Sequence, residues 1–251
     1  MVAPVSLTLF AHIAARPEDE LDLAEAALLI GDAAYPGLDV PHYLRLLDQL
    51  GGDARRAVER PLRSPEATPG SGPVEQLLRW FYGELGFHGN ASDYYDPKNS
   101  YLHEVLDRRT GIPITLAVVL LEVCWRIGVE AQGVSFPGHF LVRTPVRGGV
   151  MLIDPFEGRL LGREDLRALH ARATGTPRDP DPRLLVPAQK RQILVRMLNN
   201  LRSIYSSRSD APRLRSVLER MQVLAPSDEL RKELDQLGGE RPWPSAGRGV
   251  N

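Results

Sequence analysis

The stretch GIPITLAVVLLEVCWRIG, residues 111–128, decides the fold class, because nearly every position in it is apolar. Proline suits the first helical position and glycine is a natural helix stop, so Pro113 and Gly128 predict the two ends of one helix. A helix that is apolar on all sides is buried in the core of a protein. The stretch therefore predicts a buried central helix.

After this helix the apolar period changes to two, which is typical of strands. Segments 129–135, 139–143 and 150–154 are predicted to be strands, with a turn at Gly148 and Gly149 between the last two. Before the helix, apolar stripes predict helices over 19–34, 40–50, 53–60 and 73–85, and a further helix from Tyr101 that Asn99 or Ser100 would cap. Helices, then a buried helix, then antiparallel strands indicate an α+β fold.

The C-terminal part is separated from this core by a polar, proline-rich stretch at about 172–187. Beyond it, apolar stripes over 193–205 and 214–221 and a short helix from about 227 predict a small helical hairpin unit. We therefore expect four parts: a helical N-terminal region plus core over 1–172, a linker over 173–187, the helical segment over 188–238, and a disordered tail rich in glycine and proline over 239–251.

The composition is typical of a globular protein, with 43% hydrophobic residues, 25% charged residues and a net charge of −1. Such a balance points neither to nucleic acid nor to a membrane surface. No apolar run approaches the ~20 residues of a membrane span, and the apolar start lacks the positive charge of a signal peptide before Arg16. One cysteine fits a reducing compartment, so we expect a cytoplasmic protein without a membrane partner.

That cysteine, Cys124, lies about eleven residues into the predicted helix, roughly 16 Å from its start. We expect it to be a small buried core residue rather than a nucleophile. The six histidines are scattered without metal-binding spacing, and no glycine-rich loop opens a helix after a strand. The sequence therefore predicts no metal site and no cofactor.

His139 and Asp154 stand at the ends of the predicted hairpin strands. If Arg143 faces Val150, antiparallel register places His139 opposite Asp154, with Cβ atoms about 4.5–5.5 Å apart. A carboxylate in that place fixes the tautomer of an imidazole and stabilises its charge. The pair is either a functional centre or a structural hydrogen bond near a loop, and spacing alone leaves both readings open.

Thr115 is the hydroxyl nearest to the predicted helix start. A threonine in a first helical turn usually satisfies a local backbone group. As a nucleophile it would need His139 within hydrogen-bond reach.

Four strings occur in order along the chain: NSYL at 99–102, RRTGIPITL at 108–116, GVSFPGHFL at 133–141 and IDPF at 153–156. With them, residues 18–240 resemble the bacterial SirB-type branch of the transglutaminase-like superfamily. The resemblance implies a transglutaminase-like (papain-like) core, with helices before it and tetratricopeptide-like helices after it. One departure is His103, where such proteins often have asparagine.

In catalytic members of that superfamily, a cysteine starts the central helix, and a histidine and an aspartate follow on adjacent strands. The resemblance matches these last two to His139 and Asp154. It places the cysteine position at Ile112, Pro113 or Ile114, none of which is nucleophilic. The resemblance therefore implies the fold without the thiol chemistry.

The missing nucleophile beside an intact His–Asp pair favours a non-catalytic regulatory or protein-interaction module. Its pocket, with Asn99, Pro113 and Phe136 as candidate lining residues, would recognise a peptide or a small polar ligand. Its C-terminal helices would hold an unknown protein or peptide partner. The alternative is a weak amide or ester hydrolase, with His139 as base and water or Thr115 as nucleophile, because positioned acid–base groups contribute about 10²–10⁴-fold.

A second alternative is nucleic-acid binding through residues 186–222, where eight basic side chains face only two acidic ones. The eight are Lys190, Arg191, Arg196, Arg202, Arg208, Arg213, Arg215 and Arg220. The structural explanation of this basic excess is that the eight side chains form a solvated face, or that they dock on the first sixty residues. That region has ten acidic side chains and five basic ones. Nucleic-acid binding would show a steep salt dependence and is the least expected of the three functions.

Overall fold

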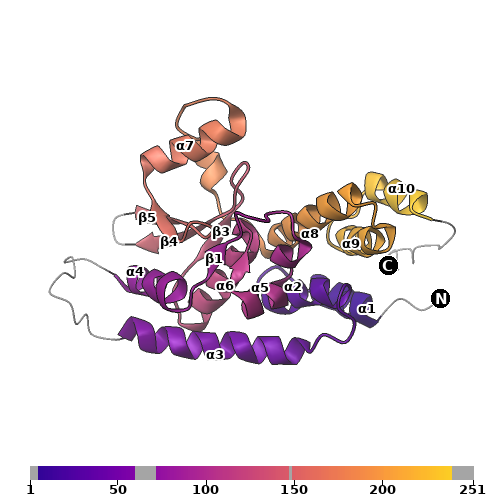
Figure 1. Ribbon diagram of the computed structural model, residues 1–251, viewed down its shortest axis with the longest axis horizontal. Helices are drawn as coiled ribbons and strands as arrows, with labels where there is room; N and C mark the ends of the chain where they lie inside the picture. Colours follow the sequence, from indigo (N-terminus) through magenta and orange to yellow (C-terminus); the bar gives the residue numbers. More distant parts are fainter. Residues whose placement is uncertain (1–4, 60–71, 147–148, 239–251) are drawn as a thin grey trace, which may run out of the picture.

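The computed structural model describes residues 5–59, 72–146 and 149–238, and a helix buried at its centre organises the fold (Figure 1). This helix is α6 (Pro113–Arg126), and every residue from Pro113 to Cys124 is buried. It contacts α3 (Val40–Glu59) on one side and the strands β3 and β4 on another. The predicted buried central helix and the α+β fold class are therefore confirmed.

A four-stranded antiparallel sheet follows α6, in the order β3-β4-β5-β6. Its strands are β3 (Gln132–Val134), β4 (Leu141–Val146), β5 (Gly149–Asp154) and β6 (Arg159–Leu161). The sequence predicted the first three but not β6. A short parallel pair, β1 (His88–Gly89) and β2 (Thr110–Gly111), was also not predicted.

The predicted register of the hairpin is wrong by two residues. Arg143 faces Leu152 rather than Val150, and Val150 faces Pro145, because β4 continues to Val146 and pairs there with Gly149. A shift by two keeps every side chain on its predicted face, whereas a shift by one would have reversed the faces.

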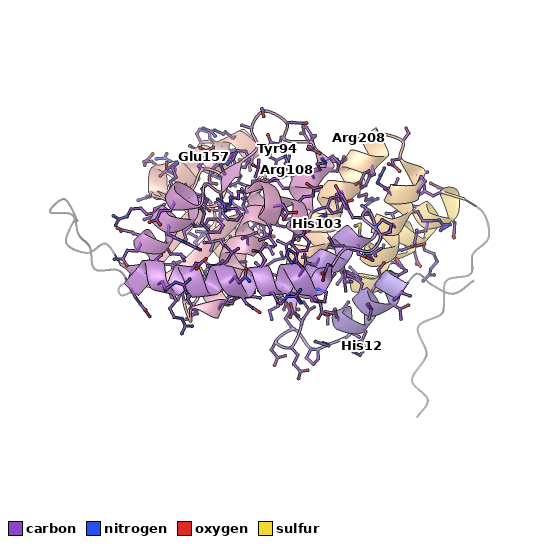
Figure 2. The ribbon with its side chains drawn as sticks, turned by 60° about the horizontal axis from the view of Figure 1, so that its bottom comes forward. His12, Tyr94, His103, Arg108, Glu157 and Arg208 are labelled. Carbon is purple, nitrogen blue, oxygen red and sulfur yellow. The ribbon has the colours of Figure 1, made fainter. Side chains whose placement is uncertain are left out.

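Most of the N-terminal half is helical: α1 (Val5–Ala14), α2 (Leu23–Asp32), α3, α4 (Pro73–Leu78) and α5 (Leu102–Arg108). Figure 2 shows α3 running along one face of the molecule. The two helices predicted over 40–60 are this single helix, because Gly51 packs against Arg126 of α6 and does not interrupt it. The helix α1 was not predicted.

The segments beside α4 and α5 differ from the prediction in detail. The helix predicted over 73–85 is α4 followed by a π-helical turn, η1 (Arg79–Glu84). Neither Asn99 nor Ser100 caps α5, because both end a 3₁₀ turn, η2 (Pro97–Ser100), and Tyr101 is the N-cap residue.

After the sheet come α7 (Arg163–Thr174), a 3₁₀ turn η3 (Pro182–Leu185), and three helices: α8 (Lys190–Ser207), α9 (Ala211–Leu224) and α10 (Asp228–Gln236). The apolar face of α8, including Leu194, Leu198 and Leu201, belongs to the same hydrophobic core as α6. A smaller cluster of Val134, Phe136 and Leu141 lies under α7 and η3. The expected tail over 239–251 lies outside the described residues. Within the described part of the chain, no helix is long and apolar enough to cross a membrane.

Candidate functional site

His139 and Asp154 form a hydrogen bond at one end of the sheet. The ring Nε2 of His139 lies 2.8 Å from Oδ1 of Asp154. His139 comes just before β4, in a turn where Gly138 adopts a positive φ of 66°, and Asp154 is the last residue of β5. The two residues are diagonal neighbours rather than directly opposed partners, and they remain on one face because the register error was even.

The carboxylate of Asp154 is held by the chain that follows it. Its Oδ1 also accepts hydrogen bonds from the backbone N–H groups of Phe156 at 2.9 Å and Glu157 at 3.2 Å. Burial raises the pKa of Asp154, but the hydrogen bond and charge of His139 and these two N–H donors outweigh it, so the pKa lies below its ordinary value. Asp154 is therefore ionised at neutral pH.

An ionised Asp154 accepts only, so Nε2 of His139 carries the proton of their hydrogen bond. In the neutral ring this leaves Nδ1 as a proton acceptor. Among the described residues Nδ1 has no hydrogen-bond partner. The side chain of His139 is 14% exposed, against 3% for Asp154, so the histidine is the member of the pair that a ligand can reach.

The pair opens into a groove of about 620 Å³, which we call the His–Asp groove. One wall is aromatic, with the rings of Tyr94 and Phe156 6.0 Å apart between centroids. Arg159 and Arg172 supply positive charge on another wall, and Pro113 marks the start of α6. A concave site with an apolar body and a few convergent polar groups is typical of ligand binding.

A smaller hollow of about 30 Å³ lies directly over the start of α6. Ile112, Pro113 and Ile114 form its floor, and Tyr94 and His139 are among its other lining residues. This is where the superfamily resemblance places a nucleophile. The side chains present there are apolar, so the His–Asp pair faces no hydroxyl or thiol from α6.

Of the other predicted site residues, only Pro113 lines the groove. Thr115 is fully buried and turned into the core, and its hydroxyl has no hydrogen-bond partner among the described residues. The structure therefore does not bring Thr115 to His139.

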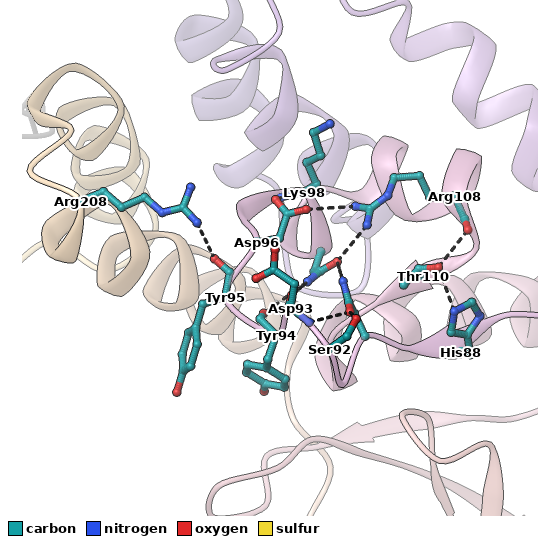
Figure 3. Close-up of polar contacts among 12 residues, drawn as sticks. His88, Ser92, Asp93, Tyr94, Tyr95, Asp96, Lys98, Arg108, Thr110 and Arg208 are labelled. Atoms are coloured by element: carbon teal, nitrogen blue, oxygen red, sulfur yellow. Dashed lines mark hydrogen bonds and ion pairs between the residues drawn. The ribbon is translucent and has the colours of Figure 1, made fainter.

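Asn99 and Phe136 were predicted to line the pocket, and this is wrong, because both side chains are fully buried behind it. The amide of Asn99 donates to the carbonyls of Asp93 at 2.7 Å and Tyr94 at 3.3 Å, and so holds the loop that carries Tyr94. Figure 3 shows this loop, with Asp93, Tyr94 and Tyr95 labelled. Phe136 packs with Val134 and Leu141 in the smaller core cluster. Both residues support the walls of the groove.

Sequence reasoning missed Tyr94, Phe156, Arg159 and Arg172 as groove residues. Tyr94 and Tyr95 are adjacent exposed aromatic residues in the polar stretch 90–96, and this signal could have been used. The two arginines carry no such signal, because their place in the groove depends on the β5–β6 turn and on α7.

A further missed residue, Arg196 of α8, holds the loop that carries His139. Its guanidinium donates to the carbonyls of His139 at 2.5 Å and Phe136 at 3.1 Å, and it lies over the ring of Phe140 at 5.6 Å. Burial lowers the pKa of Arg196 below its ordinary value. The geometry of His139 thus depends on the C-terminal helices.

Cys124 is buried in the core, as predicted. Its exposed fraction is 2%, and burial raises the pKa of its thiol to about 12. A thiol with this pKa is almost entirely protonated at neutral pH and is a poor nucleophile. No group of three or more histidine, cysteine, aspartate or glutamate side chains within the described residues could hold a metal ion.

His103 lies in α5, away from the groove (Figure 2). Its ring packs edge-on against Tyr35, with 4.5 Å between centroids, and it is 4% exposed. Neither ring nitrogen has a hydrogen-bond partner among the described residues, and burial lowers the pKa of His103 below its ordinary value. We regard it as a packing residue.

The eight basic side chains over 186–222 all contact other parts of the chain. Lys190 donates to the carbonyl of Leu21 at 2.8 Å, Arg191 pairs with Glu18, and Arg220 donates to the carbonyl of Leu29 at 3.2 Å. The others hydrogen-bond or pair within the C-terminal helices, with the His139 loop or with Tyr95. These contacts favour the structural explanation, and they leave few of these charges available for phosphate groups.

Comparison with known proteins identifies relatives over most of the chain. The family model of the transglutaminase-like superfamily matches residues 41–199. A UPF0162 protein of Xylella fastidiosa is 39% identical over 236 residues, which cover 90% of this chain and 80% of that protein. A UPF0162 protein of Pseudomonas aeruginosa is 34% identical over 185 residues, 74% of this chain and 65% of its own length. F-box only protein 21 of Mus musculus is 50% identical over 62 residues, 25% of this chain and 10% of that protein. No solved structure matches the chain significantly.

Proposed function

Because the chain belongs to the transglutaminase-like superfamily, and to its UPF0162 proteins, we propose that it is a non-catalytic member that acts as a regulatory or protein-interaction module. In this proposal the His–Asp groove binds a peptide or small polar ligand. The observation that carries it is the start of α6, where Ile112, Pro113 and Ile114 form an apolar floor beside an intact His139–Asp154 pair.

The pair is suited to recognition without a nucleophile. Asp154 fixes the orientation and tautomer of His139, and Nδ1 of the ring can accept a hydrogen bond from an amide or hydroxyl of a ligand. The aromatic wall of Tyr94 and Phe156 adds apolar contact area, and Arg172 and Glu157 add one charge of each sign.

We also assign the chain to the SirB-type branch of the superfamily, on the four sequence strings that it carries in order. In this assignment α8, α9 and α10 are the tetratricopeptide-like segment, after a linker over 173–187 and a first unit over 1–172, and they hold a protein partner. A cytoplasmic location fits the single buried thiol.

The test combines a binding assay and a turnover assay on the full chain. Peptide pools are titrated against the wild type and His139→Gln, and both are incubated with a broad panel of amides and esters. We expect peptide binding that weakens in His139→Gln and no turnover above the rate in buffer. Turnover that disappears in His139→Gln would show that the protein is an enzyme.

A specific observation favours the hydrolase as the second candidate. His139 has an ionised carboxylate on Nε2 and an unpartnered Nδ1 next to an open groove, which is the arrangement of a general base with room for water. The nucleophile in this candidate is water, since Thr115 is buried. The turnover arm of the same experiment decides between the two functions.

A further inference from the structure

We propose that the His–Asp groove and a hollow along α8 are two halves of one channel, which binds a single extended peptide segment of a partner protein. This inference rests on the proposed function, because it assumes that the His–Asp groove binds ligands.

The first argument is the continuity of the hollows. The small hollow over the start of α6 shares His139, Tyr94 and Pro113 with the His–Asp groove. On its other side it shares Arg196 and Asn200 with a hollow of about 640 Å³ along α8, which we call the α8 hollow. The three hollows therefore lie next to one another around the loop that carries His139.

The second argument is the chemistry of the α8 hollow. One face of α8 packs into the core, and the neighbouring face lines the hollow with Gln192, Val195, Arg196, Asn199 and Asn200. The side-chain amides of Asn199 and Asn200 have no hydrogen-bond partner among the described residues. An amide donates and accepts at once, as a peptide group does, so each of these two side chains can hydrogen-bond to the backbone of an extended chain.

Length is the third argument. The lining residues of α8 run from Arg191 to Asn200, which at 1.5 Å per residue is about 14 Å. An extended peptide spans that length with about four residues. A small polar metabolite would occupy only one of the hollows, whereas a peptide of about ten residues reaches both.

Arg196 is the junction between the two halves. Its guanidinium holds the carbonyl of His139, and its side chain lines both the small hollow and the α8 hollow. A peptide that crosses from one half to the other passes over this side chain. The C-terminal helices and the transglutaminase-like core would thus bind one ligand together, rather than each bind a separate partner.

The test measures peptide length against affinity by fluorescence anisotropy on the full chain. The probes are fluorescein-labelled random pools of tetrapeptides and of dodecapeptides with equal average charge. We expect the dodecapeptide pool to bind about tenfold more tightly, because the second half of the ligand binds from an already tethered end.

The matched variants separate the two halves. The double variant Asn199→Ala, Asn200→Ala removes the free amides without opposing helix formation. We expect it to weaken dodecapeptide binding about fivefold. The part of the tetrapeptide binding that His139→Gln abolishes belongs to the His–Asp groove, and it should persist in the double variant. Ser203→Ala, an exposed change on α8 beyond the hollow, is the control and should bind both pools like the wild type.

Equal affinity for the two pools, or unchanged dodecapeptide binding in the double variant, would overturn the channel. In that case tetrapeptide binding that is lost in His139→Gln would leave the proposed function intact. Failure of both pools to bind would overturn the proposed function, and the channel with it.

Discussion

The guanidinium of Arg196 donates a hydrogen bond of 2.5 Å to the main-chain carbonyl of His139. A side chain of α8 therefore holds the loop that carries the histidine of the candidate site. The same guanidinium also serves the carbonyl of Phe136, at the beginning of that loop. The C-terminal helices are thus part of the structure of the site, although they come fifty residues later in the sequence.

Replacing Arg196 by methionine should destabilise the protein and disorder the site together. Two carbonyls lose a charged donor, and each unsatisfied buried group costs about 1–3 kcal/mol. Urea unfolding measures the loss of stability, and the NMR signals of the His139 ring report the loop. Arg202→Met is the control, because that side chain pairs with Glu233 at a partly exposed place and should cost less than about 1 kcal/mol. Equal losses in the two variants would contradict the special role of Arg196.

Asp154→Asn should lower the stability at neutral pH by about 1–3 kcal/mol, because the neutral amide oxygen accepts these hydrogen bonds more weakly than the ionised carboxylate does. The folded-state pKa of Asp154 lies below its ordinary value. Its contribution is therefore complete above the unfolded-state pKa of about 3.9 and is lost as the pH falls through the folded-state pKa. Urea unfolding of the wild type and the variant at pH 7, 4 and 3 should show a difference that narrows with acid. Glu157→Gln, an exposed carboxylate in the same turn, should show no such difference.

The buried His103 should make the stability depend on pH in a higher pH range than Asp154 does. Burial lowers its pKa in the folded state, so the unfolded chain binds the proton more readily. Stability should accordingly fall as the pH drops below about 6.5, the pKa of an unperturbed histidine. His103→Asn removes the titrating group and should flatten the unfolding free energy between pH 7 and 5. The same change at the exposed His12 should leave the slope as it is, and a steep slope in His103→Asn would assign the effect to another group.

Replacing each of two adjacent glycines of α3 by alanine should change the stability of the protein in opposite directions. A Cβ at Gly51 would lie 2.7 Å from the Cβ of Arg126, so Gly51→Ala must push α3 away from α6, at a cost of about 1–3 kcal/mol. At Gly52 the nearest atom would be 3.8 Å away. Gly52→Ala should therefore stabilise the helix by about 0.5–1 kcal/mol. Thermal or urea unfolding of the pair checks the packing of α3 on α6, and a stabilising Gly51→Ala would contradict it.

The parts of the fold that depend on local apolar pattern could be predicted from the sequence. The helix α6 followed from its continuous apolar run, and the strands β4 and β5 from their period of two. The register could not be predicted, because it depends on how far β4 continues and on the length of the turn. The prediction that His139 lies close to Asp154 was nevertheless correct, since an error of two residues does not change the face of a strand on which a side chain lies.

The walls of the groove could not be predicted in the same way. Asn99 looked available for a ligand, but its hydrogen bonds to the loop over 90–96 bury it, and burial depends on tertiary packing. Tyr94, Arg172 and Arg196 come from three segments that are far apart in the sequence. No local pattern relates them, so only the three-dimensional structure identifies them as neighbours of His139.

Restoring a thiol at the start of α6 tests whether the site still has the geometry for nucleophilic chemistry. Pro113 lines both the His–Asp groove and the small hollow, as His139 does. In Pro113→Cys the new thiol sits in the first turn of α6, where the helix dipole favours the thiolate and a protonated His139 would lower its pKa further. We expect iodoacetamide to label it with a pH profile centred below about 8.5, the ordinary value for cysteine, and His139→Ala in the same background to raise that midpoint.

The native Cys124 is a built-in negative control, because its burial should keep the wild type unlabelled. Ala91→Cys, elsewhere on the groove wall, should react with an ordinary pH profile. If Pro113→Cys and Ala91→Cys have the same profile, His139 does not face the start of α6 closely enough to activate a nucleophile, and the pair serves binding alone.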